Sequence, residues 1–235
     1  MRLASSFRHR LDNFFGRLER LRARSTVRRF HRLYYSLRET TWTNTRFLGV
    51  PVAKNPLDLW VYQEIISEVR PGLIVESGTA HGGSALYMAS VCDLLGRGRV
   101  VSVDIAPVED LPAHERITFI KASSTDPATA ASIEGMIKPG EAVMVVLDSS
   151  HQRDHVLEEL RLYAPLVTPG SYLILEDTNL NGRPVMWRHG PGPAEALEIF
   201  LRTHPEFEPD ASREKFLLTF NPRGYLRRRP GAPGD

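Results

Sequence analysis

Five short apolar runs, separated mostly by stretches of helical character, constrain the fold of this chain more than any other feature. The runs lie at 73–76, 100–104, 117–121, 142–148 and 171–176. They lack the alternation of apolar and polar residues that a half-exposed strand shows, so each run is expected to be a strand buried on both faces. The helical stretches lie at 83–95, 127–137, 152–163 and 193–203. This order predicts a doubly wound α/β fold with a mostly parallel sheet.

The two ends of the chain depart from this alternation. Apolar residues around Phe207 and at 216–220 are too close in sequence for a crossover helix, which predicts a C-terminal antiparallel hairpin. Residues 39–60 predict an irregular connector, followed by a helix over 58–69. The predicted domains are a basic helical arm at 1–38, the α/β domain at 39–226 and a disordered tail at 227–235.

The arm carries most of the positive charge of the protein. Residues 1–38 hold eleven arginines and two acidic residues, a net charge of +9, which leaves −7 for the remainder of a chain whose total is +2. Apolar residues recur in the arm at helical spacing: Leu3, Phe7, Leu11, Phe14, Leu18 and Leu21. This amphipathic pattern favours docking on the body or another subunit, and secondly contact with an anionic membrane surface. Nucleic acid is not expected as a partner, because no recognition module follows.

Cysteine content and hydropathy limit the remaining classes of protein. The single cysteine, Cys92, excludes an intramolecular disulfide and a multi-cysteine metal site. No apolar run approaches the roughly 18 residues that a transmembrane helix needs, and no signal-peptide pattern follows Met1. A cytoplasmic protein is therefore expected.

Carboxylates follow four of the five predicted strands. They are Glu76, Asp104, Asp148, Glu176 and Asp177. Ligands of doubly wound sheets bind at the carboxyl ends of the strands, so these side chains are expected to form one acidic rim. Such a rim suits metals, ribose hydroxyls or other cations.

The loop after the first of these strands has the composition of a nucleotide-binding turn. Gly78 and Gly82 allow a tight turn and close approach of a ligand, and Ser84 opens the next helix. The loop is neither a P-loop nor the G-x-G-x-x-G dinucleotide fingerprint. Asp104 lies 26 residues after Gly78, where an acid suits a ribose diol. Together with Glu76, this layout is typical of S-adenosylmethionine-dependent methyltransferases, whose positively charged sulfonium also suits an acidic rim.

The later carboxylates predict a metal site. Neighbouring strands lie about 4.8 Å apart, so Asp148, Glu176 and Asp177 could meet around one ion. Three carboxylates without a thiolate favour Mg²⁺, or Mn²⁺ or Ca²⁺, over zinc. His151 would open the following helix beside the ion, where it could accept a proton. Helix capping and a supporting hydrogen bond remain alternative roles for His151.

Several linked motifs resemble the cephalosporin hydroxylase/rhamnosyl O-methyltransferase family. The similarity covers residues 42–226 and includes the segments at 76–85, 123–126, 147–151, 155–157, 175–179, 181–185 and 190–196. Members of this family have the seven-stranded class I methyltransferase fold and bind S-adenosylmethionine, and related macrolide-sugar enzymes use Mg²⁺ with a histidine base. The resemblance implies cofactor contacts from Glu76, Gly78, Thr79, Gly82, Ser84, Asp104, Ser123, Ser124 and Asp148. It also implies metal ligands at Asp148, Glu176 and Asp177 and a catalytic base at His151.

The expected function is therefore Mg²⁺- and S-adenosylmethionine-dependent O-methylation. The resemblance implies that the acceptor is a sugar hydroxyl, of rhamnosyl type, on a glycosylated natural product or glycolipid. It also implies a homo-oligomer, because relatives use helical N-terminal extensions in assembly. The alternative is a hydroxylase, or a partner protein of one, as the first family name suggests. An Fe(II) oxygenase would need two histidines and a carboxylate around its metal.

Overall fold

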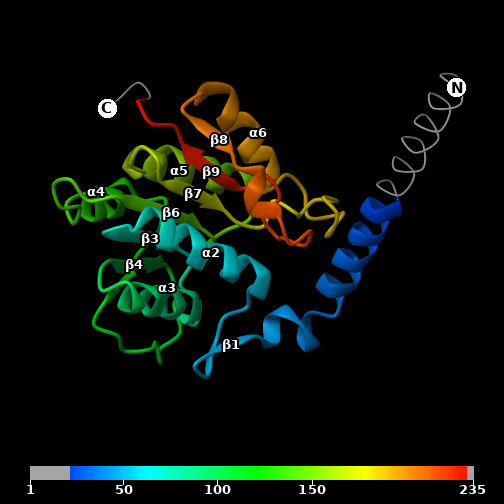
Figure 1. Ribbon diagram of the computed structural model, residues 1–235, viewed down its shortest axis with the longest axis horizontal. Helices are drawn as coiled ribbons and strands as arrows, with labels where there is room; N and C mark the ends of the chain where they lie inside the picture. Colours follow the sequence, from blue (N-terminus) through cyan, green and yellow to red (C-terminus); the bar gives the residue numbers. More distant parts are fainter. Residues whose placement is uncertain (1–21, 232–235) are drawn as a thin grey trace, which may run out of the picture.

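A seven-stranded sheet forms the centre of the computed structural model, which describes residues 22–231 (Figure 1). The strands are β3 (Leu73–Ser77), β4 (Arg99–Asp104), β5 (Ile117–Lys121), β6 (Val143–Leu147), β7 (Tyr172–Leu175), β8 (Phe207–Pro209) and β9 (Tyr225–Arg228). Their order is β5-β4-β3-β6-β7-β9-β8, and β9 runs antiparallel to both of its neighbours. The doubly wound, mostly parallel sheet with a C-terminal antiparallel hairpin is thereby confirmed.

Helices cover both faces of the sheet. The helices α2 (Pro56–Val69) and α3 (Gly83–Leu94) cover one face, and α4 (Pro127–Glu134), α5 (Arg153–Tyr163) and α6 (Pro193–Thr203) cover the other. Strand residues alternate between the two cores: Val145 packs with α5, and its neighbours Met144 and Val146 pack with α2 and α3. Burial on both faces explains why the strand sequences are continuously apolar.

Short elements connect the N-terminal part of the chain to this sheet. The 3₁₀ turns η1 (Arg38–Thr40) and η2 (Trp42–Asn44) lead into a small hairpin of β1 (Arg46–Phe47) and β2 (Val50–Pro51). The hairpin precedes α2, which starts where the Asn55 side chain accepts a hydrogen bond from the backbone of Leu57. Two further 3₁₀ turns are η3 (Ala164–Leu166) and η4 (Ala211–Glu214).

The predicted second strand of the hairpin, at 216–220, is wrong. That segment is a loop, and its Phe220 backbone amide donates to the Asp58 carboxylate (2.9 Å) instead of to a neighbouring strand. The strand is β9, in which Arg227 lies opposite Tyr172 of β7 and Glu208 of β8. The predicted tail at 227–235 therefore begins inside the sheet.

Residues 22–36 form a helix at the side of the body (Figure 1). His31 stacks on Phe220 with ring centroids 5.6 Å apart, and its Nε2 lies 3.0 Å from Asn179 Nδ2. Arg32 donates to the Pro184 carbonyl (3.2 Å). These contacts agree with the expectation that the arm docks on the body. The predicted stripe from Leu3 to Leu21 lies outside the described residues.

The sheet order locates the functional edge. β3 pairs with β4 on one side and with β6 on the other, so the chain crosses in opposite directions from this point. Such a reversal opens a crevice at the carboxyl ends of the central strands. Among residues 22–231, no helix is long and apolar enough to cross a membrane.

Candidate active site

Two neighbouring strands bring the predicted acidic residues to one edge of the sheet. β6 leads into Asp148, and β7 leads into Glu176 and Asp177. The two strands are parallel, with Leu147 opposite Leu175, so the residues that follow them lie side by side. The backbone amide of Glu176 donates to the Leu147 carbonyl (3.1 Å), which extends the ladder beyond the strand ends.

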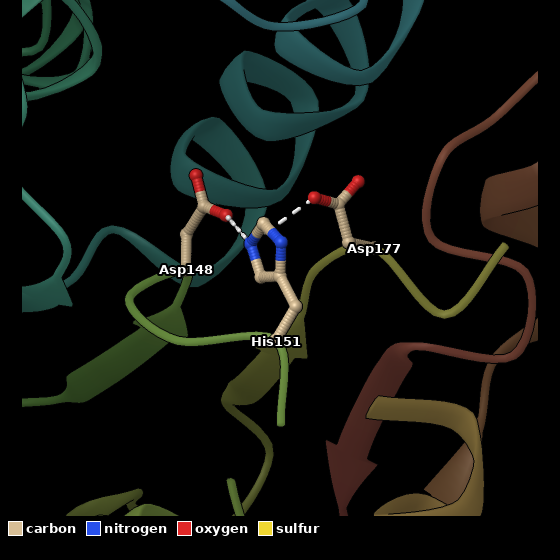
Figure 2. A group of neighbouring side chains, drawn as sticks. All are labelled: Asp148, His151 and Asp177. Atoms are coloured by element: carbon tan, nitrogen blue, oxygen red, sulfur yellow. Dashed lines mark hydrogen bonds and ion pairs between the residues drawn. The ribbon is translucent and has the colours of Figure 1, made fainter. Parts of the chain in front are cut away.

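His151 lies between two of these carboxylates (Figure 2). Its Nε2 atom is 3.3 Å from Asp148 Oδ1 and 3.1 Å from Asp177 Oδ2. One donor atom from each of the three residues lies within 4.8 Å of the others. This cluster therefore unites the predicted base with two of the three predicted metal ligands.

The third predicted ligand, Glu176, faces a different set of partners. Its Oε1 accepts hydrogen bonds from the Lys54 ammonium and from the Tyr62 hydroxyl. Lys54 also forms an ion pair with Asp148 Oδ2 (2.5 Å). Lys54 thus bridges Asp148 and Glu176, and the structure does not bring all three carboxylates around one point.

Sequence reasoning missed Lys54 and Tyr62. Lys54 belongs to the segment predicted as an irregular connector, and Tyr62 matched the apolar face of a helix. Both side chains are buried, with Lys54 only 4% exposed. A lysine directly after the apolar residues 50–53 and before the start of α2 is the signal that could have pointed to a buried ammonium.

The proximity of these charges shifts their pKa values. Burial lowers the pKa of His151, but Asp148 and Asp177 outweigh burial and raise it to about 9. Burial, together with the Asp148 charge, raises the pKa of Glu176 to about 8. Burial also raises the pKa of Asp177 to about 6, against the opposing effect of His151. With these groups alone, His151 is an imidazolium at neutral pH.

The donor set fits a hard divalent cation. Asp148 and Asp177 supply oxygen ligands, and the half-buried cluster contains no thiolate. In this structure the two carboxylates share the positive charge of His151, which a bound cation would replace. Among the described residues this cluster holds one histidine, so the two-histidine set of the hydroxylase alternative is not formed.

The glycine loop after β3 lies next to this cluster. Gly78 has φ +91°, and a Cβ atom there would lie 2.0 Å from the Asp148 carbonyl oxygen. Gly78, Thr79 and Ser84 line a first hollow, which also reaches Lys54, Asp104 and Asp148. Gly82, with φ +76°, is the N-cap of α3 and does not line this hollow.

Glu76 stabilises the loop through hydrogen bonds from buried side chains. Its side chain is fully buried and accepts hydrogen bonds from Ser84 Oγ (2.5 Å) and Ser102 Oγ (2.6 Å). The Thr79 hydroxyl also bonds to Ser102 (2.8 Å). Glu76 therefore shapes the loop in this structure and does not line the first hollow.

Asp104 lies where the first hollow meets a second one. The second hollow is lined by Val103, Asp104, Ile105, Ser123, Ser124, Ser149, Ser150 and His155. Asp104 accepts hydrogen bonds from the backbone amides of Ala80 (3.0 Å) and Ala106 (2.9 Å), which orient its carboxylate. The two hollows share Asp104 and Ser149, so the predicted cofactor residues other than Glu76 and Gly82 line one continuous path.

The sheet order and the position of the site at the carboxyl ends of the strands are those of the class I methyltransferase fold. Solved structures share this fold. The structure titled "cmcI-D160 Mg-SAM" matches with a TM-score of 0.61 and 22% identity, covering 79% of this chain and 77% of that chain. A second, of the MycE methyltransferase from mycinamycin biosynthesis with Mg, SAH and mycinamycin VI, has a TM-score of 0.52 and 18% identity, with 74% and 50% covered.

The chain belongs to the Rhamnosyl O-methyltransferase/CmcI family, which it matches over residues 39–229. A curated relative, the rhamnosyl O-methyltransferase of Mycobacterium tuberculosis (strain ATCC 25618 / H37Rv), is 41% identical over 207 residues, covering 85% of this chain and 83% of the relative. The predicted family and enzyme class, an O-methyltransferase, are confirmed.

Proposed function

We propose that this protein transfers a methyl group from S-adenosylmethionine to a sugar hydroxyl, with a divalent cation bound at the Asp148–His151–Asp177 cluster. The observation that carries the proposal is the position of this cluster beside the Gly78 loop, with Asp148 belonging both to the cluster and to the lining of the first hollow. A methyl donor in the path of the two hollows and an acceptor at the cluster would meet at one edge of the sheet.

The cofactor path suits the parts of S-adenosylmethionine. Asp104, held between two backbone amides, has lone pairs left to accept the ribose hydroxyls. The acidic groups around the first hollow favour the positively charged sulfonium and amino groups. A structural neighbour bound to magnesium and S-adenosylmethionine supports the same pair of cofactors here.

The cation is Mg²⁺, with Asp148 and Asp177 as ligands. Glu176 is a third ligand only if it leaves Lys54 and Tyr62, and we retain it as a proposed ligand on that condition. A bound Mg²⁺ supplies positive charge that lowers the pKa of an acceptor hydroxyl and of the nearby imidazole. Lys54 neutralises part of the acidic charge around this position.

His151 is the proposed base. Its Nε2 faces both Asp148 and Asp177, which orient the ring. With a cation bound to the two carboxylates, Nε2 would lose its proton, and the freed Nε2 would then take the proton of the acceptor hydroxyl while the acceptor oxygen attacks the methyl carbon. A C–O bond forms as the S–C bond breaks, so the products are a methyl ether, S-adenosylhomocysteine and a proton on His151. Positioning and stabilisation of the developing oxyanion supply most of the rate gain.

The acceptor is a small-molecule glycoside of rhamnosyl type, on a natural product or a glycolipid. The name of the 41% identical relatives supports this class of acceptor. A methyl-transfer assay with labelled S-adenosylmethionine tests it across rhamnosides and other glycosides, with EDTA and after Mg²⁺ is returned. Methylation of a glycoside that EDTA stops and Mg²⁺ restores, also without oxygen, is expected. No transfer to any sugar, or full transfer in EDTA, would contradict the proposal.

The proposal also covers the partners and the location of the protein. We expect a cytoplasmic homo-oligomer, with peripheral membrane contact through residues 1–38 as a further interaction. Phe30, Leu33 and Leu37 of the arm are each about half exposed, which leaves an apolar face without a partner in the described residues. Light scattering of the full chain and of a chain lacking residues 1–38, together with vesicle co-sedimentation, tests both interactions.

A further inference from the structure

A group of four polar side chains lies beside the second hollow, and the proposed function gives no role to three of them, Ser149, His155 and Glu159. Ser149 Oγ donates to Glu159 Oε1 (2.6 Å). His155 Nε2 lies 3.1 Å from Ser149 Oγ, 3.3 Å from Ser124 Oγ and 3.7 Å from Glu159 Oε1. His155 and Glu159 are four residues apart on α5, so they share one face of that helix. Ser124, Ser149 and His155 line the hollow, and Glu159 lies behind them.

Glu159 is an unusual residue for the inner face of a helix. It is fully buried, and its Oε2 atom has no hydrogen-bond partner among the described residues. Burying a carboxylate is costly unless it is paired and hydrogen-bonded. A carboxylate in this position accepts hydrogen bonds and cannot donate them, so it imposes a direction on the groups bonded to it.

The donor and acceptor roles can then be assigned one after another, from Glu159 to the residues of the second hollow. The single hydroxyl proton of Ser149 is used on Glu159, so Ser149 Oγ can only accept from His155. His155 must then carry its proton on Nε2, because an unprotonated Nε2 would place two lone pairs against each other. The same N–H faces Ser124 Oγ, which therefore also accepts.

This arrangement leaves the proton of Ser124 without an acceptor among residues 22–231. Ser124 is 6% exposed, and in the described part of the chain its Oγ has no hydrogen-bond partner apart from His155. Ser123, in the same hollow, differs because its Oγ bonds to the Thr125 side chain (3.0 Å). Ser124 is thus a buried hydroxyl whose one free donor is available to a ligand in the second hollow.

We propose that Glu159, acting through Ser149 and His155, fixes Ser124 as a hydrogen-bond donor that recognises one ring nitrogen of the cofactor purine. The proposal rests on the proposed function, because the second hollow adjoins Asp104 and so would receive the base attached to the ribose. Val103 and Ile105 give that hollow apolar walls suited to a flat ring. Ser124 contacts the cofactor, and Ser149, His155 and Glu159 are positioning residues.

Calorimetric titration of the full-length protein tests this proposal. The ligands are S-adenosylhomocysteine and its 1-deaza, 3-deaza and 7-deaza analogues, in each of which a C–H replaces one ring nitrogen. The wild-type protein is expected to bind one analogue about tenfold more weakly than the parent compound. Ser124→Ala is expected to bind the parent about tenfold more weakly and to lose its discrimination against that analogue. Glu159→Gln is expected to lose the same discrimination, since an amide can donate to Ser149 and reverse the chain.

Two further variants separate positioning from a general loss of structure. Ser90→Ala, which removes a hydroxyl on α3 outside both hollows, should keep the wild-type affinity and the wild-type ratio between the parent and each analogue. If Glu159→Gln fails to fold, His155→Gln and His155→Leu carry the test, because Gln keeps a donor and Leu does not. Retained discrimination in Ser124→Ala, or a wild type that binds all analogues equally, would overturn this inference alone. Failure of the wild type to bind S-adenosylhomocysteine would overturn the proposed function together with it.

Discussion

The basic helix at 22–36 and the acidic cluster at the ends of β6 and β7 differ in how their charges are stabilised. Within residues 22–231, the arginines at 22, 24, 28, 29, 32 and 38 form no ion pair with a carboxylate. In the cluster, by contrast, Asp148, Glu176 and Asp177 each have a cationic partner. Water solvates exposed charges at little cost, whereas buried charges need partners inside the protein. Removing one charge should therefore have a large effect on stability or activity at the cluster and a small one on the helix.

The largest effect is expected from His151→Ala. Loss of the proposed base should lower the rate of methyl transfer by about 10² to 10⁴-fold, while S-adenosylhomocysteine still binds. Asp148→Ala is expected to abolish turnover as well. Steady-state rates with labelled S-adenosylmethionine and calorimetry measure the two properties separately. Wild-type turnover in either variant would remove the cluster from the mechanism.

A large change in stability is expected from Lys54→Met. The substitution leaves Asp148 and Glu176 without their buried ammonium, which should lower the free energy of unfolding by about 3–5 kcal/mol. Lys215→Met is the matched control, because Lys215 pairs with Glu64 at the surface and its removal should cost at most about 1 kcal/mol. Urea denaturation in EDTA compares the variants. Equal losses would show that burial does not distinguish the two ion pairs.

A smaller effect is expected from pH in the metal-free protein. The pKa values of His151, Glu176 and Asp177 are raised to about 9, 8 and 6, so the folded state holds protons that the unfolded chain has lost. The stabilisation from His151 is complete below its unfolded pKa of about 6.5 and disappears as the pH rises through 9. Ionising the two buried acids destabilises the folded state. This destabilisation grows as the pH rises towards 6 for Asp177 and towards 8 for Glu176.

Stability should therefore fall between pH 6 and pH 9. The slope is about 1.4 kcal/mol per pH unit for each additional proton held by the folded state. Urea midpoints across this range in EDTA measure it, and His151→Gln should flatten the decline. A free energy of unfolding that increases between pH 6 and pH 9 would contradict this prediction.

The smallest effect is expected on the helix. Arg28→Gln and Arg29→Gln together should change the free energy of unfolding by no more than about 0.5 kcal/mol, because both side chains are exposed and have no carboxylate partner. Methyl transfer to a water-soluble glycoside should also be unchanged. Thermal denaturation and the transfer assay check both expectations, and a loss comparable with that of Lys54→Met would end the contrast between the regions.

The sheet and the residues of the Asp148–His151–Asp177 cluster could be predicted from the sequence because their signals are local. Each buried strand is a continuous apolar run, and Asp148 and Asp177 come directly after such runs. The partners of Glu176 were not accessible in the same way. Lys54 lies 122 residues from Glu176 in the chain, and nothing local in either segment specifies that contact.

The error at the C-terminal end has a similar physical origin. The apolar residues at 216–220 indicated a strand. Leu218 and Phe220 are instead buried residues of a loop that packs against α2 and the helix at 22–36. The true strand, β9, consists of apolar Tyr225 and Leu226 followed by arginines at 227 and 228. Because of these arginines, the sequence pattern indicated a basic tail. Tertiary packing outweighed the local pattern in both segments.

Gly78 gives this enzyme a point at which activity can be removed without altering its charge. A methyl group there would collide with the carbonyl of Asp148 at 2.0 Å, and φ +91° is unfavourable for any L-residue with a side chain. Gly78→Ala is therefore expected to force the loop after β3 away from the end of β6 while every acid, base and hydroxyl of the site is kept. Such a variant would serve as an inactive form with unaltered electrostatics, suited to separating what the surface of the protein binds from what its chemistry does.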